Sequence, residues 1–291
     1  MKASLYEAKI HSVLDRISNN EHVDIEDAWI DHAAEAFKAA LKRQLSVDPD
    51  RDKFRVRMSN IGKPICQLKL DKAGTPKRRM PYNHVVRMLL GDATEAVMEV
   101  IVRAAGLPIT GGKDKVKLQL GEYIVEGEDD VEIDNKVYDY KSCSPFAFDH
   151  KWKGGMTSLN AEDSFGYIPQ EIGYATAKGK EPGGWIVVNK SSGEVLVVEA
   201  NVTQEQKEKI LKNMEHTVKA VMEDEPFERC FEAEDEFFRK KPTGNKKLPM
   251  VCTFCSFFNS CWPEAQLKPQ ALSKAANPKQ VWYAEYHEET D

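Results

Sequence analysis

The stretch from residue 127 to residue 141, GEDDVEIDNKVYDYK, constrains the fold of this chain more than any other part of its sequence. Valine and tyrosine favour strands, and the Asp-Asn pair at positions 134 and 135 is typical of a hairpin turn. Asp139 and Lys141 are two residues apart on the second strand, so their side chains are expected on one face, with Asp130 beside them. Two carboxylates and a lysine in this arrangement can hold a hard divalent cation and a water to be activated. A lone D-x-K tripeptide is common in charged sequences, however, and it also fits a solvated hairpin.

Size and composition are those of a globular protein with a sizeable core, since 41% of the 291 residues are hydrophobic and 30% are charged. No apolar run has the length of a membrane span, and the N-terminal residues lack the apolar core of a signal peptide. We therefore expect a cytoplasmic protein, in a bacterial cell or a phage-infected host, without a membrane partner. The formal net charge of −6 argues against a general nucleic-acid coat, but it is compatible with a DNA enzyme that has a local basic groove.

A C-x2-C-x5-C group at Cys252, Cys255 and Cys261 is the second strong feature. Closely spaced cysteines in a cytosolic chain indicate ligation of a soft metal or a cluster in preference to disulfides. Three thiolates leave one position of a closed site open. Three further cysteines could supply the fourth ligand: Cys66, Cys143 and Cys230.

Apolar residues at helical spacing predict helices near residues 25–45, 83–105, 165–178 and 203–223, and strand patterns cover residues 115–124 and 183–200. Glu95 lies on the second of these helices, one turn before Glu99. Gln170 and Tyr174 share a face of the third helix, which is also compatible with simple packing against a sheet. Two basic stretches are candidate contacts to a nucleic-acid strand, through phosphate attraction and base stacking: Lys77, Arg78 and Arg79 in a loop, and Lys151, Trp152 and Lys153.

Short motifs therefore follow one another from residue 59 to residue 261. They are Ser59–Cys66, a serine-led turn before a cysteine; Gly91–Glu95, with an acid four residues after a glycine; Gly127–Asp130; Asp139–Lys141, a (D/E)-x-K motif; Gln170–Tyr174, a Q-x-x-x-Y motif; and the three C-terminal cysteines. In this order they resemble the RecB-like branch of the PD-(D/E)XK nuclease superfamily, and more narrowly its iron–sulfur members, which include the CRISPR-associated RecB-like exonucleases and the AddB helicase-nuclease subunit. The sequence departs from the family at Glu95, where many members have histidine, and at residues 127–130, which lack the proline of the superfamily's name.

The resemblance implies an α/β fold with a restriction-endonuclease-like mixed sheet flanked by helices, and a cysteine-cluster subdomain that joins the N- and C-terminal regions. On this basis we expect an N-terminal helical region with the first cluster cysteine over residues 1–80, a nuclease core over residues 81–225, and a cysteine-cluster region and tail over residues 226–291. The implied activity is that of a metal-dependent DNA exonuclease that acts on single-stranded DNA or DNA ends.

The resemblance also implies roles for individual residues. Glu95, Asp130 and Asp139, with the backbone carbonyl of Tyr140, would hold one or two Mg²⁺ or Mn²⁺ ions. Lys141 would sit beside the attacking water, although a plain salt bridge to Asp139 is the alternative. Gln170 and Tyr174 would bind the backbone of the strand or position Lys141.

For the cysteines, the resemblance implies a [4Fe-4S] cluster held by Cys66, Cys252, Cys255 and Cys261, and the alternative is a structural zinc ion. Partners expected from the family are DNA and a helicase, recombination or integrase protein. The alternative function is a weakly catalytic or non-catalytic DNA-binding adaptor of nuclease fold in recombination or CRISPR adaptation.

Overall fold

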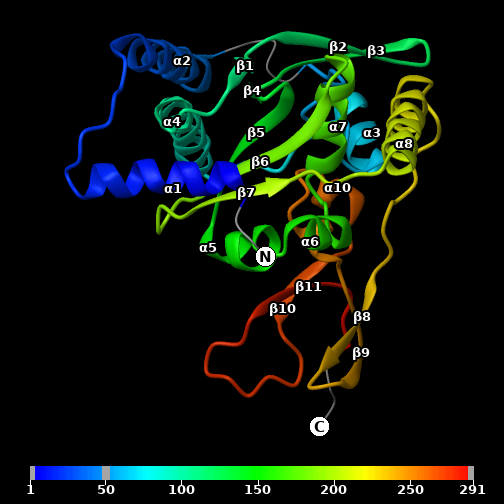
Figure 1. Cartoon of the computed structure of the whole chain (residues 1–291). Coiled ribbons are helices and arrows are strands. Elements are labelled where there is room, and N and C mark those ends of the chain that lie inside the picture. Colours follow the sequence, from blue (N-terminus) through cyan, green and yellow to red (C-terminus); the bar gives the residue numbers. More distant parts are fainter. Residues whose placement is uncertain (1–3, 48–52, 288–291) are drawn as a thin grey trace. The chain divides into compact units, whose positions relative to one another are not determined.

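A computed structural model describes residues 4–47 and 53–287 of the chain (Figure 1). The chain divides into two structural units and passes from one to the other more than once. The first unit takes residues 1–62 and 81–219, and the second takes residues 63–80 and 220–291. The segment with Cys66 therefore belongs to the same unit as the C-terminal cysteines. The division into three segments that the sequence suggested stays a prediction.

A five-stranded mixed sheet forms the centre of the first unit, with the strand order β1-β4-β5-β6-β7. Its strands are β1 (Ile109–Gly111), β4 (Val131–Ile133), β5 (Lys136–Cys143), β6 (Glu181–Asn189) and β7 (Val195–Glu199). Only β5 and β6 pair in parallel, and the other neighbours are antiparallel. The fold is thus of the mixed α/β class, as expected.

The turn between β4 and β5 is the predicted hairpin. Asp134 and Asn135 have φ angles of 50° and 61°, the left-handed pair that a two-residue hairpin of matching twist requires. The pairing extends only from Ile133 opposite Lys136 to Val131 opposite Tyr138. Because β4 begins at Val131, the part of β5 beyond Tyr138 has no strand on that side.

Helices cover both faces of the central sheet, as the alternation of buried side chains along its strands requires (Figure 1). Tyr138 and Tyr140 of β5 pack on one face with Met98 and Val102 of α4 (Asn83–Ala104). Val137, on the opposite face, belongs to a cluster that contains Tyr174 of α7 (Tyr167–Ala177) and residues of α8 (Gln204–Met222). Helix α1 (Leu5–Ser18) packs on β7 and α4, and α2 (Asp27–Leu45) packs on α4.

A separate hairpin of β2 (Lys115–Leu120) and β3 (Tyr123–Glu128) lies against the α7 side of the unit. The sequence suggested one strand over residues 115–124, but the chain reverses at Gly121, whose φ of 57° is a conformation that glycine adopts without strain. Three short helical segments follow β5: α5 (Pro145–Ala147), η1 (Phe148–Trp152) and α6 (Gly155–Ala161).

The second unit combines three short helices with a four-stranded antiparallel sheet of order β10-β11-β9-β8. The helices are α3 (Ile65–Lys72), α9 (Met250–Thr253) and α10 (Phe258–Cys261), and the strands are β8 (Glu234–Phe238), β9 (Lys241–Lys247), β10 (Gln266–Pro269) and β11 (Gln280–Glu285). Leu248, Phe258 and Trp262 form its core together with Cys252. Within the described ranges of the chain, no helix has the length and apolar character needed to cross a membrane.

Candidate active site and cysteine centre

The open side of β5 is the place where the predicted acidic residues meet. Asp130 directly precedes β4, and its Oδ2 atom accepts a hydrogen bond of 2.9 Å from the backbone N–H of Tyr140. The N–H and C=O groups of one strand residue point to the same side, so the Tyr140 carbonyl also faces this open edge. The hairpin therefore does bring Asp130 beside the second strand, as the sequence predicted.

Asp139 and Lys141 share one face of β5 and form an ion pair with each other. Asp139 is only 4% exposed. The pKa of Asp139 is raised to about 7, mainly by burial and also by the adjacent Asp130 carboxyl, while the Lys141 ammonium acts against both. Burial alone would lower the pKa of Lys141, but the carboxylates of Asp139 and Asp130 raise it above its ordinary value, so this lysine is charged. Two carboxyl groups and one ammonium thus lie close together, largely shielded from solvent.

Glu95 lies on α4, and a lysine that the sequence did not single out connects it to Asp130. The Lys113 ammonium contacts Glu95 and lies 3.6 Å from Oδ1 of Asp130. Lys113 follows two glycines and has a φ of 60°, so the chain bends sharply here and carries the lysine between the two acids. Asp130 therefore has Lys113 and Glu95 on one side, and Asp139 with the Tyr140 backbone on the other.

The carboxylate oxygens of the three predicted metal ligands, Glu95, Asp130 and Asp139, do not all lie within 4.8 Å of one another. In this arrangement they are spread more widely than the ligands of one ion. Among the described residues, the one set of three acids whose oxygens all lie within 4.8 Å of one another is Asp114, Asp129 and Glu132, a different set. A lysine already occupies that cluster, because Lys178 Nζ lies 2.6 Å from Asp114 and 3.0 Å from Asp129 and also contacts Glu132. We therefore regard it as a buried ion-pair network that ties β4 to the end of α7.

Helix α7 brings Gln170 and Tyr174 to the same region of the unit. Tyr174 is 5% exposed, and its ring packs so closely over Gly127 that a Cβ there would lie 2.7 Å from the ring. Burial raises the pKa of Tyr174 to about 12, against a side-chain hydrogen bond with Gln170 that lowers it. The Gly127–Asp130 segment and the Q-x-x-x-Y helix are thus packed directly on each other.

Glu171 is a buried acid that sequence reasoning missed, although it lies inside the Q-x-x-x-Y motif. One of its carboxyl oxygens accepts hydrogen bonds of 3.2 Å from the N–H groups of Gly183 and Gly184, and the other has no hydrogen-bond partner. Burial raises the pKa of Glu171 well above its ordinary value, and the charge of Asp139 adds to this. A neutral Glu171 fastens α7 to the start of β6 without adding another negative charge beside the acidic pair.

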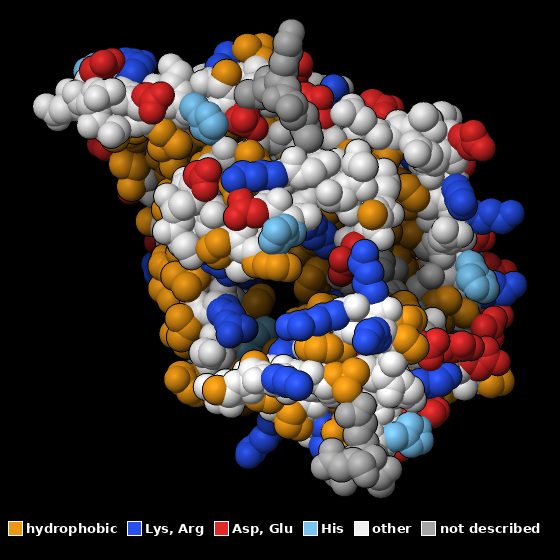
Figure 2. Space-filling view, turned by 90° about the horizontal axis from the view of Figure 1, so that it is seen from below, with side chains coloured by type: hydrophobic (Ala, Val, Ile, Leu, Met, Phe, Trp, Pro, Cys, Tyr) orange, Lys and Arg blue, Asp and Glu red, His pale blue; other side chains and the backbone are white. Residues whose placement is uncertain are grey.

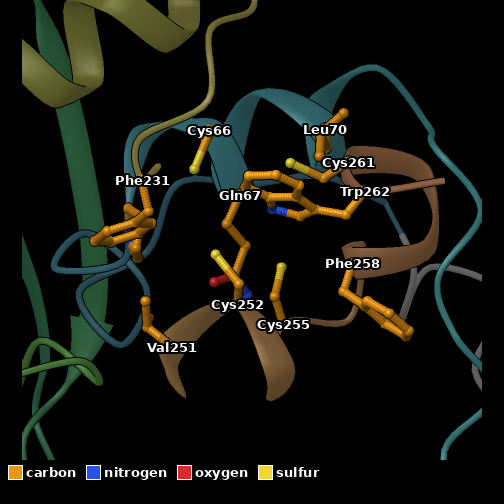
Figure 3. A pocket seen from close by; sticks show the side chains of 11 residues that line it. Cys66, Gln67, Leu70, Phe231, Val251, Cys252, Cys255, Phe258, Cys261 and Trp262 are labelled. Atoms are coloured by element: carbon orange, nitrogen blue, oxygen red, sulfur yellow. The ribbon is translucent and has the colours of Figure 1, made fainter. Parts of the chain in front are cut away.

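The second unit holds the cysteines. Cys66 on α3, Cys252 on α9, Cys255, and Cys261 on α10 line one small cavity, and Figure 3 shows their sulfur atoms turned toward a common space. Burial raises the pKa of the Cys252 thiol to about 11, and it also raises the pKa values of Cys255 and Cys261. These thiols therefore carry protons at neutral pH until a cation displaces them.

The two remaining cysteines do not line this cavity, but Cys230 lies directly beside Cys66. Cys143 is buried at the end of β5, in the first unit, within a hydrophobic cluster that contains Trp152 and Trp185. Cys230 is exposed, and its sulfur accepts a hydrogen bond of 3.0 Å from the backbone N–H of Cys66 without lining the cavity. The four cysteines expected from the resemblance are thus the ones that line the cavity.

The spacing of the sulfur atoms bears on which group they could hold. Within the described part of the chain, no three cysteine sulfurs lie within 4.8 Å of one another. A tetrahedral zinc site with Zn–S bonds of about 2.3 Å places its sulfurs about 3.8 Å apart. The thiols as they stand are therefore spread more widely than the ligands of a zinc ion.

The residues predicted to contact a nucleic-acid strand differ in their surroundings. Trp152 is only 2% exposed and packs on Trp185, so the prediction that it stacks on a base is wrong. Lys153 pairs with Asp149, whereas Lys151 lies over the rings of Phe165 and Tyr167. In the other unit, Lys77 pairs with Asp71. Figure 2 shows lysine and arginine side chains among exposed apolar ones.

Comparisons with known proteins give little to set beside this geometry. No family model matches the chain, and no curated protein matches it. The crystal structure of SSO0001 is similar over 77% of this chain and 93% of that one, with 11% sequence identity and a TM-score of 0.40. A likeness at this level carries no argument about fold or function.

Proposed function

We propose that this protein is a deoxyribonuclease that depends on Mg²⁺ or Mn²⁺, an exonuclease acting on single-stranded DNA or DNA ends, with a restriction-endonuclease-like core of the RecB-like kind. The observation that carries the proposal is the close approach of the half-buried Asp130 to the buried Asp139 at the open edge of β5, with Lys141 beside them. Neighbouring carboxyl groups of which one is buried favour the binding of a cation, because a cation offsets both the burial and the repulsion that raise the pKa of Asp139.

Asp130 is the central ligand in this proposal, because it faces a second acid on each side. One cation position lies between Asp130 and Asp139, within reach of the Tyr140 carbonyl, and the other lies between Asp130 and Glu95, where the Lys113 ammonium now sits. A pair of positions that share one carboxylate explains why the three acids do not converge on a single point. Divalent ions bound there would polarise the scissile phosphate and supply a hydroxide at neutral pH.

Lys141 contributes a fixed positive charge at the place where negative charge develops on the phosphate. The carboxylates of Asp139 and Asp130 keep it protonated, so it serves as an electrostatic stabiliser and does not act as a base. Gln170 and Tyr174 hold the other wall of the site, since their mutual hydrogen bond and the close packing of Tyr174 on Gly127 fix α7 against the acidic segment. In this position they orient the strand backbone or Lys141.

The proposal is tested by incubating end-labelled single and double strands with Mn²⁺ and either the wild-type protein or the Lys141→Ala variant. Mononucleotides should accumulate with the wild type, and the variant should lose at least a hundredfold in rate, because a preorganised charge on the transition state is removed. Equal and negligible release by both proteins would count against nuclease activity.

Lys113 supports a second candidate, a DNA-binding adaptor of nuclease fold. Its ammonium already pairs with Glu95 and lies 3.6 Å from Asp130, so these two acids have a cationic partner without a metal ion. An adaptor would bind DNA equally well in Mn²⁺ and in EDTA and would release no nucleotides. A nuclease would show release that appears only with the divalent ion.

The cysteine centre would hold a structural [4Fe-4S] cluster through Cys66, Cys252, Cys255 and Cys261. The support is the convergence of these four thiols and a sulfur spacing wider than zinc requires. Because α3 lies far from the C-terminal helices in sequence, such a group would close a long loop and stabilise the second unit by restricting its unfolded chain.

A further inference from the structure

An exposed aromatic ring lies next to the candidate active site on the loop between α6 and α7. Phe165 is 57% exposed, and its ring stacks on Tyr167 with a centroid distance of 5.6 Å and an interplanar angle of 23°. The Lys141 ammonium lies 5.5 Å from the centre of the Tyr167 ring. One ring therefore separates the lysine of the (D/E)-x-K motif from a solvent-facing phenylalanine.

The loop that carries Phe165 is held firmly in place. Both carboxylate oxygens of Asp163 accept hydrogen bonds of 2.8 Å from the first N–H groups of α7, those of Tyr167 and Ile168. Gly166, the residue after Phe165, lies so close to Gly62 that a Cβ on Gly166 would lie 2.4 Å from the Gly62 Cα atom. An exposed aromatic side chain on so well anchored a backbone loses little conformational entropy when a ligand stacks on it.

Lys151 completes the arrangement. Its ammonium lies 5.3 Å from the centre of the Phe165 ring and 4.9 Å from that of Tyr167. No carboxylate in the described ranges forms an ion pair with it; burial lowers the pKa of Lys151, and the nearby charges of Asp163 and Glu162 act against this. Proteins bind single strands without sequence preference by combining aromatic side chains, on which bases stack, with positive charges that attract the phosphates.

We propose that Phe165, Tyr167 and Lys151 form a stacking platform for one unpaired nucleobase of the DNA strand whose phosphate enters the site at Lys141. The platform selects single strands or frayed ends, because a base inside a duplex is already stacked and paired and cannot present its face to Phe165. It tolerates any base, because every base has a face that can stack. This inference rests on the proposed function and names the form of DNA that the site accepts.

The test is binding without cleavage. Fluorescence anisotropy of a labelled oligo(dT) single strand and of a blunt duplex, in EDTA, should be compared for the wild type and for Phe165→Ala, Phe165→Trp and Phe146→Ala. Phe146 is the matched control, since it is 73% exposed in the same unit but its ring tilts against His150 at an interplanar angle of 59° and contacts neither Tyr167 nor Lys151 in the ring and cation–π pairs of the described residues. Phe165→Ala should weaken single-strand binding by about tenfold, the loss of one stacked base, whereas Phe165→Trp and Phe146→Ala should bind like the wild type.

Duplex affinity should be the same in all four proteins, and thermal unfolding should show that the exposed substitutions leave the fold intact. The inference is overturned if Phe165→Ala binds single strands like the wild type, if Phe146→Ala causes the same loss, or if the duplex loses as much affinity as the single strand. Because no cleavage is measured, a protein that binds in this manner but releases no nucleotide would contradict the nuclease proposal and leave the platform standing.

Discussion

Replacing Lys113 by methionine tests whether the acids at the open edge of β5 form a cation site. Methionine keeps much of the volume of the lysine stem but removes the ammonium that now contacts Glu95 and lies 3.6 Å from Asp130. Any divalent ion that binds between these two carboxylates must first displace that ammonium. The substitution should therefore strengthen metal binding, although it removes a native ion pair.

The size of the effect follows from the two ion pairs that the ion must break. Both are partly exposed, with about a third of the Glu95 side chain open to solvent, so each is worth no more than about 1 kcal/mol. Removing both in advance should strengthen Mn²⁺ binding by about 1–2 kcal/mol, which is a factor of about 5–30 in the dissociation constant.

Loss of the free Mn²⁺ signal in electron paramagnetic resonance, or titration calorimetry, would measure this constant. Lys117→Met is the control, because Lys117 pairs with Glu126 in an exposed position on the β2–β3 hairpin and should leave Mn²⁺ binding unchanged. An unchanged or weaker affinity in Lys113→Met would refute the reasoning, since it would mean that the ion does not compete with Lys113 for these carboxylates.

Two further features of the structure give predictions. Lys178→Met should lower the free energy of unfolding in urea by about 3 kcal/mol, because it leaves Asp129 and Glu132 buried with too little positive charge. The unfolding transition should stay two-state. Burial would raise the pKa of Glu132, but its lysine partners outweigh this and lower it, so the wild type should lose stability as the pH falls through that lowered pKa, and Lys178→Met should lose less on the same acidification. Cys66→Ala should abolish the visible absorbance of anaerobically purified protein, whereas Cys230→Ala should stay brown; the opposite pattern would show that Cys230 supplies the fourth ligand.

Much of the first unit could be predicted because local sequence signals and tertiary packing agree there. The Asp-Asn pair at positions 134 and 135 can adopt left-handed φ angles, so the β4–β5 turn and its register follow from the sequence. Alternation then places Asp139 and Lys141 together on one face. Helix α4 runs over residues 83–104, almost as its apolar periodicity indicates.

The features of the site that the sequence did not predict depend on contacts that no local pattern encodes. Lys113 reaches Glu95 because two glycines allow a bend after β1, and nothing in a Gly-Gly-Lys run says which acid the lysine will meet. Trp152, between two lysines, looks like a strand contact, but the single π-helical turn of η1 directs it into the core against Trp185. Glu171 looks like an ordinary helix acid, and only the approach of the β6 backbone reveals it as a buried group.

The central claim is that Asp130 and Asp139 act together as ligands of a catalytic cation. The most direct measurement is a single-turnover assay on an end-labelled single strand, with and without Mn²⁺, for the wild type and Asp139→Asn, which keeps the shape of the side chain and removes its charge. The account predicts nucleotide release that requires both Mn²⁺ and the Asp139 carboxylate, with Mn²⁺ affinity reduced in the variant. Release that is unaffected by EDTA, or undiminished in Asp139→Asn, would contradict it.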